Sequence, residues 1–411
     1  MKFLILTQYF PPEVGAPQNR LFELAIRLQK EGIDVSILTA MPNYPAMEIH
    51  KEYKNKTYHY EKMEGLKVYR SSIFVTKSKS IVKRLQNYFS FVWSSYKVGR
   101  AKLEDNYDYI FCESPPLFLG ISALLLCRNK KAKLIFNVSD LWPESAEKLG
   151  LVTNTFFLRL ATILEEHLYK KSVLITGQTQ GISENIKSRF PKKDVYWLPN
   201  GVDLNFYNPD VVQSNWREEN GFDKDDLLLL YAGIIGHAQG LEIILNAAIK
   251  TKNEAKIKYL IVGSGPEKDK LLNLKKEHQL SHVIFLDLVP KSKMPQIVKA
   301  IDVALVPLKK LDLFLGAIPS KIFENCAMKK PLLLGVDGEA KELFIEQGKA
   351  GLFFEPENAE DLVRKIIDYN NNRDKLIEYG NNGRNYVNDF FNRDKLAKSF
   401  YKKLQQLNTK L

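Results

Sequence analysis

The sequence predicts an α/β protein made of two doubly wound, Rossmann-like parallel-sheet domains that face each other across a cleft. Three observations predict this fold. A chain of 411 residues is too long for one ordinary hydrophobic core. Short apolar segments alternate with amphipathic segments almost throughout, which is typical of parallel sheets covered by helices. The turn sequence Pro-Asn-Gly at 199–201 divides these segments into two series.

The predicted strands are short apolar runs. The first series comprises residues 2–7, 34–39, 107–112, 133–138, 173–176 and 195–198. The second series comprises residues 227–232, 257–262, 283–286, 303–306 and 331–334. A helix is predicted over 18–31, and two or three charged amphipathic helices are predicted over 359–407.

The junction between the two series sets the predicted domain boundaries. We expect a first domain over 1–198, a linker over 199–209 and a second domain over 210–392. A C-terminal helix over 393–411 is expected to be able to pack back on the first domain. Because ligands of open α/β sheets bind beyond the carboxyl ends of the strands, the site is expected where the domains face each other.

Cysteine usage and the apolar segments indicate a cytoplasmic protein. The three cysteines are far apart and match no metal-ligand or disulfide spacing, as expected in a reducing compartment. The apolar N-terminus meets Pro11 and Pro12 too early for a signal-peptide core. The longest apolar run, 117–127, is about half of the ~20 residues that cross a bilayer. We therefore expect a protein that is free in the cytoplasm or held at a membrane surface.

The net charge of +12 predicts an anionic partner, and one stretch concentrates this charge. Residues 70–103, beginning at Arg70, contain eight basic and no acidic side chains, interleaved with aromatic ones. Such a stretch favours an element on an anionic membrane surface, worth ~1 kcal/mol per basic residue. The alternative is a domain helix from Ile81 with a buried stripe and a solvated face, and both can hold. No RNA-binding signature accompanies the charge, so nucleic acid is not expected as a partner.

Residues 317–324, Ala-Ile-Pro-Ser-Lys-Ile-Phe-Glu, follow a predicted strand and open a helix. Pro319 and Ser320 are helix-start signals, and the N–H groups and dipole of a helix start bind phosphate oxygens. Lys321 adds a full positive charge, and Glu324 lies three residues later on the same helical face. This group suits a nucleoside diphosphate, with Lys321 on the diphosphate and Glu324 on the ribose hydroxyls. The alternative is an ordinary capped helix.

Glycines follow three predicted strands, in loops where the backbone can approach a ligand closely. Gly15 lies between the first strand and the first helix and is the candidate for the outer phosphate of a donor. Gly233, and then Gly263 and Gly265, follow the first two strands of the second series and suggest backbone contact with a nucleotide. A plain strand-to-helix loop is the alternative at each place, since lone glycine turns are weak signals.

Asp140 and Glu144 follow another predicted strand and are the candidate catalytic or acceptor-positioning residues. Carboxylates at the carboxyl end of a strand face the cleft of such a protein. Asp140 is nearest the strand end and is the stronger candidate. Trp142, between them, could pack on a sugar ring, although a tryptophan in such a place more often closes a core.

These motifs, in this order, resemble the retaining glycosyltransferases of family 4, which have the GT-B fold. The resemblance covers nearly the whole chain. Its motifs lie at 8–13 with Gly15, at 42–45 (Pro-Asn-Tyr-Pro), at 140–145 (Asp-Leu-Trp-Pro-Glu-Ser), at 199–203 and at 319–324 (Pro-Ser-Lys-Ile-Phe-Glu). The motifs at 140–145 and 319–324 resemble a narrower branch, the fucosamine-transferase-like enzymes of bacterial O-antigen and capsule assembly.

The resemblance implies transfer of a sugar, with retained anomeric configuration, from a UDP-sugar to a hydroxyl of a lipid-linked or polysaccharide acceptor. The branch implies an N-acetylated hexosamine or deoxyhexosamine as that sugar. The resemblance implies no metal and no cofactor besides the donor. It places the nucleotide in the second domain, with Glu324 on the ribose, and the acceptor in the first domain with the Gly15 loop. The expected location is peripheral, on the inner face of the cell membrane.

Three positions depart from the family pattern. Ile234 and Gln239 stand where the family has an Arg and a Lys on the diphosphate, and Gly316 stands where it has a sugar-binding glutamate. Charge-assisted hydrogen bonds contribute roughly 1.5–3 kcal/mol each, so their loss requires a replacement. Our hypothesis is that Lys321 and two helix N-termini replace them. A nucleotide-sugar epimerase of the same fold and a non-catalytic nucleotide-sugar binder stay open, as does guanosine in place of uridine.

Overall fold

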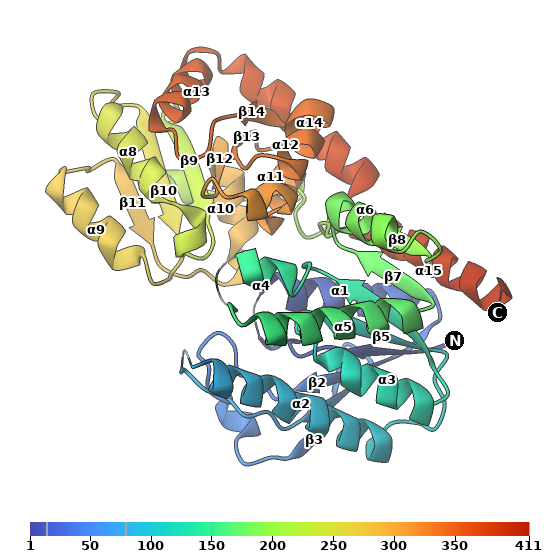
Figure 1. Cartoon of the computed structure of the whole chain (residues 1–411). Helices are drawn as coiled ribbons and strands as arrows, with labels where there is room; N and C mark the ends of the chain where they lie inside the picture. The colour runs from blue at the N-terminus through green and yellow to red at the C-terminus, as the bar shows by residue number, and fades with distance from the viewer. Residues whose placement is uncertain (14, 79, 149, 151, 411) are drawn as a thin grey trace. The chain divides into compact units, whose positions relative to one another are not determined.

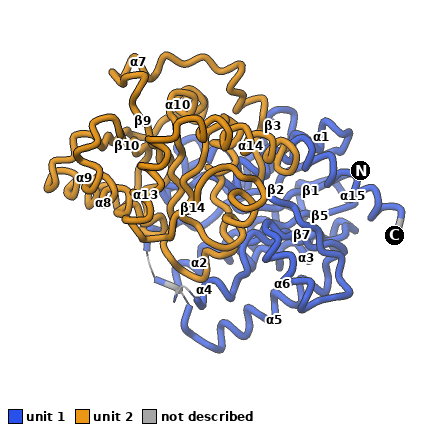
Figure 2. The backbone as a smooth tube through the Cα atoms, turned by 90° about the horizontal axis from the view of Figure 1, so that it is seen from above, with its two compact units in different colours: residues 1–200, 394–411 blue, residues 201–393 orange. Residues whose placement is uncertain are grey.

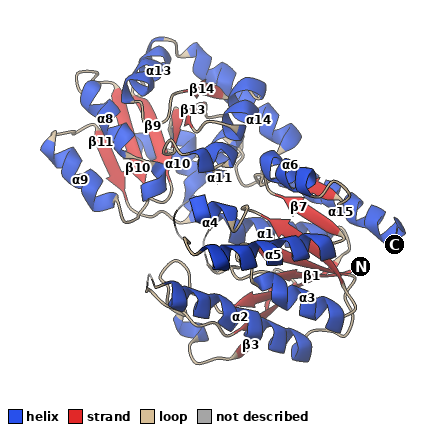
Figure 3. Cartoon of the chain, in the orientation of Figure 1, coloured by secondary structure: helices blue, strands red, loops and turns tan. Residues whose placement is uncertain are grey.

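The computed structural model describes residues 1–13, 15–78, 80–148, 150 and 152–410, which fold into two compact units. The first unit contains residues 1–200 and 394–411, and the second contains residues 201–393 (Figure 1 and Figure 2). Each unit is built on one sheet flanked by helices (Figure 3). The prediction of two parallel-sheet α/β domains is confirmed.

The sheet of the first unit has eight strands in the order β3-β4-β2-β1-β5-β6-β7-β8. These strands are β1 (Lys2–Leu6), β2 (Asp34–Ala40), β3 (Tyr58–Met63), β4 (Leu66–Ser71), β5 (Tyr109–Ser114), β6 (Lys133–Val138), β7 (Leu174–Gly177) and β8 (Val195–Trp197). Neighbours are parallel except β3 and β4, which pair antiparallel at the edge. The order reverses between β1 and β5, which is the topological switch point.

Helices cover both faces of this sheet. They are α1 (Ala16–Lys30), α2 (Ile81–Lys102), α3 (Leu119–Asn129), α4 (Glu144–Lys148), α5 (Thr155–Lys171), α6 (Gln180–Arg189) and α15 (Arg393–Lys410). Phe3 and Ile5 of β1 pack with side chains of α1 and α15. Leu4 and Leu6 of the same strand pack with side chains of α2, α3 and α5. Alternate residues of one strand therefore serve two cores, as a doubly wound sheet requires.

The C-terminal helix α15 packs on the first sheet. The ring centroid of Phe400 lies 6.4 Å from that of Phe3 and 6.0 Å from that of Phe111, both in edge-to-face contact. Lys403 Nζ lies 2.7 Å from each carboxylate oxygen of Asp194. This helix therefore covers β1 and β5, the two strands at the switch point of the first sheet.

The sheet of the second unit is fully parallel, in the order β11-β10-β9-β12-β13-β14. Its strands are β9 (Leu227–Ala232), β10 (Ile257–Val262), β11 (Val283–Leu286), β12 (Val303–Pro307), β13 (Leu332–Gly335) and β14 (Gly351–Phe353). Its helices are α7 (Trp216–Glu219), α8 (Glu242–Lys250), α9 (Lys268–Glu277), α10 (Met294–Ala300), α11 (Ser320–Ala327), α12 (Glu339–Lys341), α13 (Ala359–Asn371) and α14 (Asp374–Phe390). The switch point of this sheet lies between β9 and β12.

The sequence prediction missed the β3–β4 hairpin and the strand β14. β3 is polar along most of its length, so it lacks the apolar signal of a strand. Its turn uses Glu64 and Gly65, both at positive φ (48° and 84°), as a tight hairpin requires. β14 has only three residues. The prediction of a purely parallel first sheet is therefore wrong at this edge, whereas the predicted strands begin and end within about two residues of the observed ones.

Candidate functional site

The switch point of the second sheet brings together two motifs that the sequence singled out. Gly233 follows β9, and the segment after β12 leads into α11 at Ser320. β9 and β12 are paired neighbours, with Val303 opposite Leu229. Pro319 precedes the helix in an extended conformation, and no side chain in the described part of the chain caps it. The Ile322 N–H donates to the carbonyl of Pro319 at 3.0 Å, which leaves the Ser320 and Lys321 N–H groups of the first turn to face a ligand at this point.

Lys321 reaches from the first turn of α11 to the loop after β9. Its Nζ lies 3.6 Å from the ring centroid of Tyr231, and a Cβ added at Gly233 would lie 3.0 Å from Nζ. Burial lowers the pKa of Lys321 to about 7, and the Glu324 carboxylate opposes this shift. A bare backbone at Gly233 leaves room for the ammonium group. The site therefore contains a desolvated cation suited to an anionic ligand.

Glu324 lies one turn further along α11 and is half-buried. Burial raises the pKa of its carboxyl group. Lys291, Arg393 and Lys321 oppose that shift, as does a hydrogen bond donated by the Tyr207 hydroxyl. A carboxylate among cations at the edge of the site can accept hydrogen bonds from ligand hydroxyls.

Sequence reasoning missed a second cation at the same edge of the sheet. Lys309 follows β12, and its backbone N–H donates to the carbonyl of Ala238 at 3.0 Å. A Cβ added at Gly240 would lie 3.1 Å from Lys309 Cγ, so the side chain passes closely over this glycine. Lys309 Nζ lies 2.9 Å from Nε2 of His237. The pair therefore stands beside Gln239, the position where the family pattern has a lysine.

Glycines at two of the predicted positions allow neighbouring loops to touch. A Cβ on Gly263, where φ is 147°, would lie 1.9 Å from the carbonyl oxygen of Gly233. A Cβ on Gly265 would lie 2.2 Å from another carbonyl oxygen of the loop after β9. Their contact with a nucleotide stays a prediction. At Gly316, nothing among the described residues lies within 4 Å of an added Cβ, so there is room for the side chain that this sequence lacks.

In the first unit, Glu13 fixes the loop after β1. Its buried carboxylate accepts the backbone N–H groups of Phe10 (3.1 Å), Asn43 (2.7 Å) and Tyr44 (2.8 Å). Burial raises the pKa of Glu13, and these N–H groups oppose the shift. The motifs at 8–13 and 42–45 are therefore held together by one carboxylate.

Gly15 precedes α1 in an extended conformation, with φ 175°. The side chain of Gln18 folds back over it, so that a Cβ added at Gly15 would lie 2.4 Å from Gln18 Oε1. This oxygen is buried and has no hydrogen-bond partner among the described residues. An unpaired amide oxygen accepts hydrogen bonds and does not itself favour a phosphate, and the predicted role of Gly15 stays a prediction.

A buried polar network, which the sequence prediction missed, joins the ends of three strands of the first unit. Arg20 of α1 donates to Glu113 at 2.6 Å and to Ser139 at 2.8 Å. Asn137 and Ser139 each donate to the same carboxylate at 2.6 Å. Thr176 of β7 donates to Asn137, also at 2.6 Å. The network fixes α1 relative to the segment that follows β6. Its signal in the sequence was polar residues at the ends of apolar strands.

Asp140 lies in that segment, and Ser145 Oγ donates to its Oδ2 at 2.7 Å. Burial raises the pKa of Asp140, while hydrogen bonds from Ser145 and from the Leu141 N–H oppose the shift, and Glu144 adds to it. Glu144 is therefore near, but it is 44% exposed and pairs with Lys148 at 2.7 Å. These surroundings favour Asp140 over Glu144 as a functional residue, because carboxyl groups with shifted pKa values are typical of functional sites. Glu144 has the contacts of an ordinary helix start.

The basic stretch 70–103 divides between core and surface. Arg70 is fully buried, and its guanidinium group bonds to Glu61 and to the carbonyls of Pro11 and Ala40. Its predicted place on a basic surface is therefore wrong, because paired burial in β4 satisfies its charge. None of the helices in the described part of the chain is both long and apolar enough to cross a membrane.

The helix α2 has the two faces that the alternative interpretation predicted. Phe91 and Val92 are buried against the sheet. The exposed basic residues of the stretch are Lys77, Lys83, Arg84, Lys97, Arg100 and Lys102. Lys79 and the side chain of Ile81 lie outside the described residues. A basic face therefore remains on the surface of α2.

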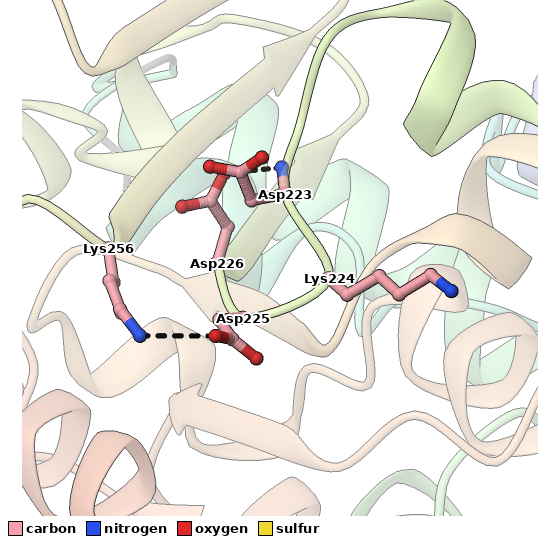
Figure 4. A pocket seen from close by; sticks show the side chains of 5 residues that line it. All are labelled: Asp223, Lys224, Asp225, Asp226 and Lys256. Atoms are coloured by element: carbon pink, nitrogen blue, oxygen red, sulfur yellow. Dashed lines mark hydrogen bonds and ion pairs between the residues drawn. The ribbon is translucent and has the colours of Figure 1, made fainter.

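A surface pocket of about 300 Å³ lies at the opposite end of the second sheet (Figure 4). Its residues, 223–226 and Lys256, come just before β9 and β10. Lys256 Nζ lies 3.3 Å from Asp225, and the Asp223 N–H donates to Asp226 at 3.0 Å. Because these are the amino ends of the strands, the pocket is separate from the candidate site. No His, Cys, Asp or Glu group among the described residues is arranged to hold a metal ion.

Two α/β units, with a cationic helix start at the switch point of one and a glycine loop at that of the other, define a class of two-domain α/β proteins. Residues 18–206 match the model of "Glycosyltransferase Family 4". Residues 212–386 match the model of "Glycosyl transferases group 1". The chain belongs to glycosyltransferase family 4 and has the GT-B fold.

Several known proteins resemble the chain along nearly all of its length. The Escherichia coli (strain K12) protein WcaI, named for glycosyl transfer in colanic acid biosynthesis, is 26% identical over 383 residues, 89% of this chain and 91% of WcaI. Sucrose-phosphate synthase from Thermosynechococcus elongatus superposes with a TM-score of 0.78 at 16% identity over all of both chains. HepE of Anabaena, solved in complex with UDP-glucose, has a TM-score of 0.72 at 16% identity over 99% of this chain and all of HepE. The structural likenesses show the fold.

Proposed function

We propose that this glycosyltransferase moves a sugar from a UDP-sugar to a lipid-linked or polysaccharide acceptor in bacterial surface polysaccharide assembly, with retention of anomeric configuration. The observation that carries the proposal is the Lys321 ammonium group, which lies against Gly233 at the switch point and one turn before Glu324. Relatives support the substrate classes: WcaI is named for colanic acid biosynthesis, and HepE was solved with UDP-glucose. The sugar is proposed to be an N-acetylated hexosamine or deoxyhexosamine.

In this proposal the donor binds at the start of α11. The diphosphate lies against Lys321 and the N–H groups of the first turn, including that of Ser320, while Glu324 accepts hydrogen bonds from the ribose hydroxyls. The diphosphate supplies the negative charge that a desolvated ammonium group lacks, so binding raises the pKa of Lys321. Cationic side chains and helix amides take the place of a metal ion, and the transfer is proposed to need none.

The proposed transfer exchanges one bond at the anomeric carbon and moves one proton. The acceptor hydroxyl oxygen attacks the anomeric carbon on the face from which the diphosphate leaves. The bond from the anomeric carbon to the β-phosphate oxygen breaks, and the hydroxyl proton passes to an oxygen of the departing UDP. Lys321 stabilises the charge that develops on this leaving group. Asp140 orients the acceptor hydroxyl, and the loop at Gly15 contacts the outer phosphate.

The protein is proposed to act on the inner face of the cell membrane. The exposed basic face of α2 supports this location, because basic side chains near an anionic bilayer contribute about 1 kcal/mol each. A lipid-linked acceptor would then be available at the same surface.

The first test is thermal stabilisation of the purified protein by UDP and GDP. UDP is expected to raise Tm, and Glu324→Ala is expected to lose most of the shift. Lys310→Ala is the matched control, because Lys310 lies exposed in the same unit and pairs with Glu355. A shift with GDP alone would contradict the uridine assignment.

Turnover then separates the candidate functions. Product from a UDP-sugar and an acceptor, with the anomeric configuration read by NMR, tests retention directly. Epimerised sugar formed without an acceptor would establish the epimerase instead. The absence of the family cations at Ile234 and Gln239 favours a non-catalytic binder as the second candidate. Tight UDP binding without turnover of any donor would support that candidate.

A further inference from the structure

One face of α5 exposes a row of large apolar side chains, which we name the α5 stripe. Phe156, Leu160 and Ile163 lie at i, i+4 and i+7 and are 70%, 50% and 56% exposed. In the second unit, comparable residues such as Leu288 and Ile377 lie on separate elements. Isolated exposed apolar side chains are ordinary, whereas several on one helical stripe mark an interaction surface.

The charges beside the α5 stripe indicate the chemistry of its partner. Arg159 and Lys171 of α5 are exposed cations, whereas the charge of Lys170 is balanced by Glu166. The acidic residues of the helix are engaged: Glu165 is buried and lies 2.6 Å from Arg189, and Glu166 pairs with Lys170 at 3.1 Å. The surface beside the stripe is therefore basic, which suits an anionic partner.

The helix α2 extends this surface. α2, α3 and α5 pack on the same face of the first sheet (Figure 1). Phe118, before α3, links the outer two, since its ring centroid lies 5.0 Å from that of Phe89 in α2 and 5.9 Å from that of Phe157 in α5. α2 contributes its basic face and Trp93, which is 54% exposed. Tryptophan and basic side chains beside an apolar stripe are typical of proteins that lie at a bilayer interface.

We infer that the α5 stripe inserts into the surface of an anionic bilayer, with the basic face of α2 beside it. A second copy of the chain fits less well, because a symmetric contact would bring the same basic side chains face to face. Trp142 joins α5 to the candidate site: its ring centroid lies 6.4 Å from that of Phe157, which follows Phe156 of the stripe, and it is two residues from Asp140. The membrane contact would therefore hold the Asp140 segment near the bilayer, where a hydroxyl on a lipid carrier would reach it. That last step rests on the proposed function.

The test is co-sedimentation of the full chain with vesicles of phosphatidylcholine and phosphatidylglycerol, without any substrate. The triple variant F156S/L160S/I163S is expected to lose at least tenfold in vesicle partition. The matched control is V211S/L288S/I377S, which removes three exposed apolar side chains (69%, 73% and 68%) from separate places in the second unit and should bind like the wild type. Circular dichroism and the UDP-induced Tm shift check that the variants are folded, since the donor residues lie in the other unit.

The outcomes separate the membrane contact from the proposed function. Loss of vesicle binding in the stripe variant with an intact UDP response supports the inference. Unchanged partition of the stripe variant would overturn it, whatever the enzyme's activity. A wild-type dimer in sedimentation velocity that the stripe variant loses, with vesicle binding retained, would also overturn it and identify a second copy as the occupant. Failure of the UDP response in the wild type would count against the proposed function alone.

Discussion

Binding of UDP should weaken as pH rises through the neutral range, because Lys321 must carry its proton to hold the diphosphate. Burial lowers the pKa of this lysine from 10.5 to about 7 in the ligand-free protein. Well below pH 7 the ammonium group is charged, so the contribution of Lys321 to Kd should be constant. Above pH 7, each unit of pH makes protonation about 1.4 kcal/mol harder. UDP is itself fully ionised above about pH 7, so its own titration does not produce this slope.

The size of the effect follows from the fraction of protein in which Lys321 is charged. With a pKa of about 7, Kd for UDP should rise about eightfold between pH 7.5 and 8.5. Binding at pH 8 should also take up close to one proton per site. Isothermal titration calorimetry in two buffers of different ionisation enthalpy measures both quantities in one series.

Two substitutions of Lys321 test whether its titration causes the pH dependence of Kd. Lys321→Arg keeps a charge that does not titrate below pH 12, so any binding it retains should be independent of pH. Lys321→Met keeps the approximate length without the charge and should bind weakly at every pH. Equal Kd values for the wild-type protein at pH 6.5 and 9, or a wild-type slope preserved in Lys321→Met, would refute the reasoning.

The same pKa shift also makes the free energy of unfolding depend on pH. The native state has the lower pKa, so between pH 7 and 10.5 the unfolded chain binds more protons than the native one. The free energy of unfolding contributed by this site therefore rises with pH across that window, and the site is least favourable below pH 7. Binding of UDP should reduce this dependence, because it raises the pKa of Lys321 in the native state toward that of the unfolded chain.

Three further predictions follow from the loops and the first unit. Gly263→Ala should lower the unfolding free energy by about 1–3 kcal/mol in denaturant titrations, because its Cβ would meet the Gly233 carbonyl at 1.9 Å; an unchanged midpoint would contradict the loop packing. Asp140→Asn should lower kcat at least tenfold with an unaltered Kd for UDP, and a kinetically silent variant would remove it from the site. Glu113→Gln should lower kcat as well, since it weakens the pairing with Arg20, and rescue by Glu113→Asp would be inconsistent with the 2.6 Å geometry.

Most of the fold could be predicted because its strands are buried on both faces. Such strands are continuous apolar runs, and β9 (Leu227–Ala232) and β10 (Ile257–Val262) have the bounds expected from the sequence. The β3 strand could not be recognised, since an edge strand that buries little can be polar along its length. The place of Arg70 was mispredicted for a related reason. A count of charges along the sequence does not reveal that Glu61 and two carbonyl groups will enclose this side chain.

The candidate site was predictable where one short motif carries several of its groups. Ser320, Lys321 and Glu324 belong to one helix start, so their spacing alone places them together. The network around Glu113 was not predictable, because Arg20 and Asn137 meet it only through the order of the strands. Contacts that depend on tertiary neighbours leave no periodic signal in the sequence.

The departures from the family pattern at Ile234 and Gln239 can be understood in the same terms. The attraction between a diphosphate and a cation depends on the distance between them, and it is the same whichever helix or loop supplies the cation. Lys321 reaches Gly233 from α11, and Lys309 crosses Gly240 from the segment after β12, so each lies beside a position where the sequence lacks a cation. Both lysines lie in the part of the chain that follows β12, which pairs with β9 at the switch point. Their places beside Gly233 and Gly240 support the hypothesis that cations from α11 and from the segment after β12 replace those that the loop after β9 lacks.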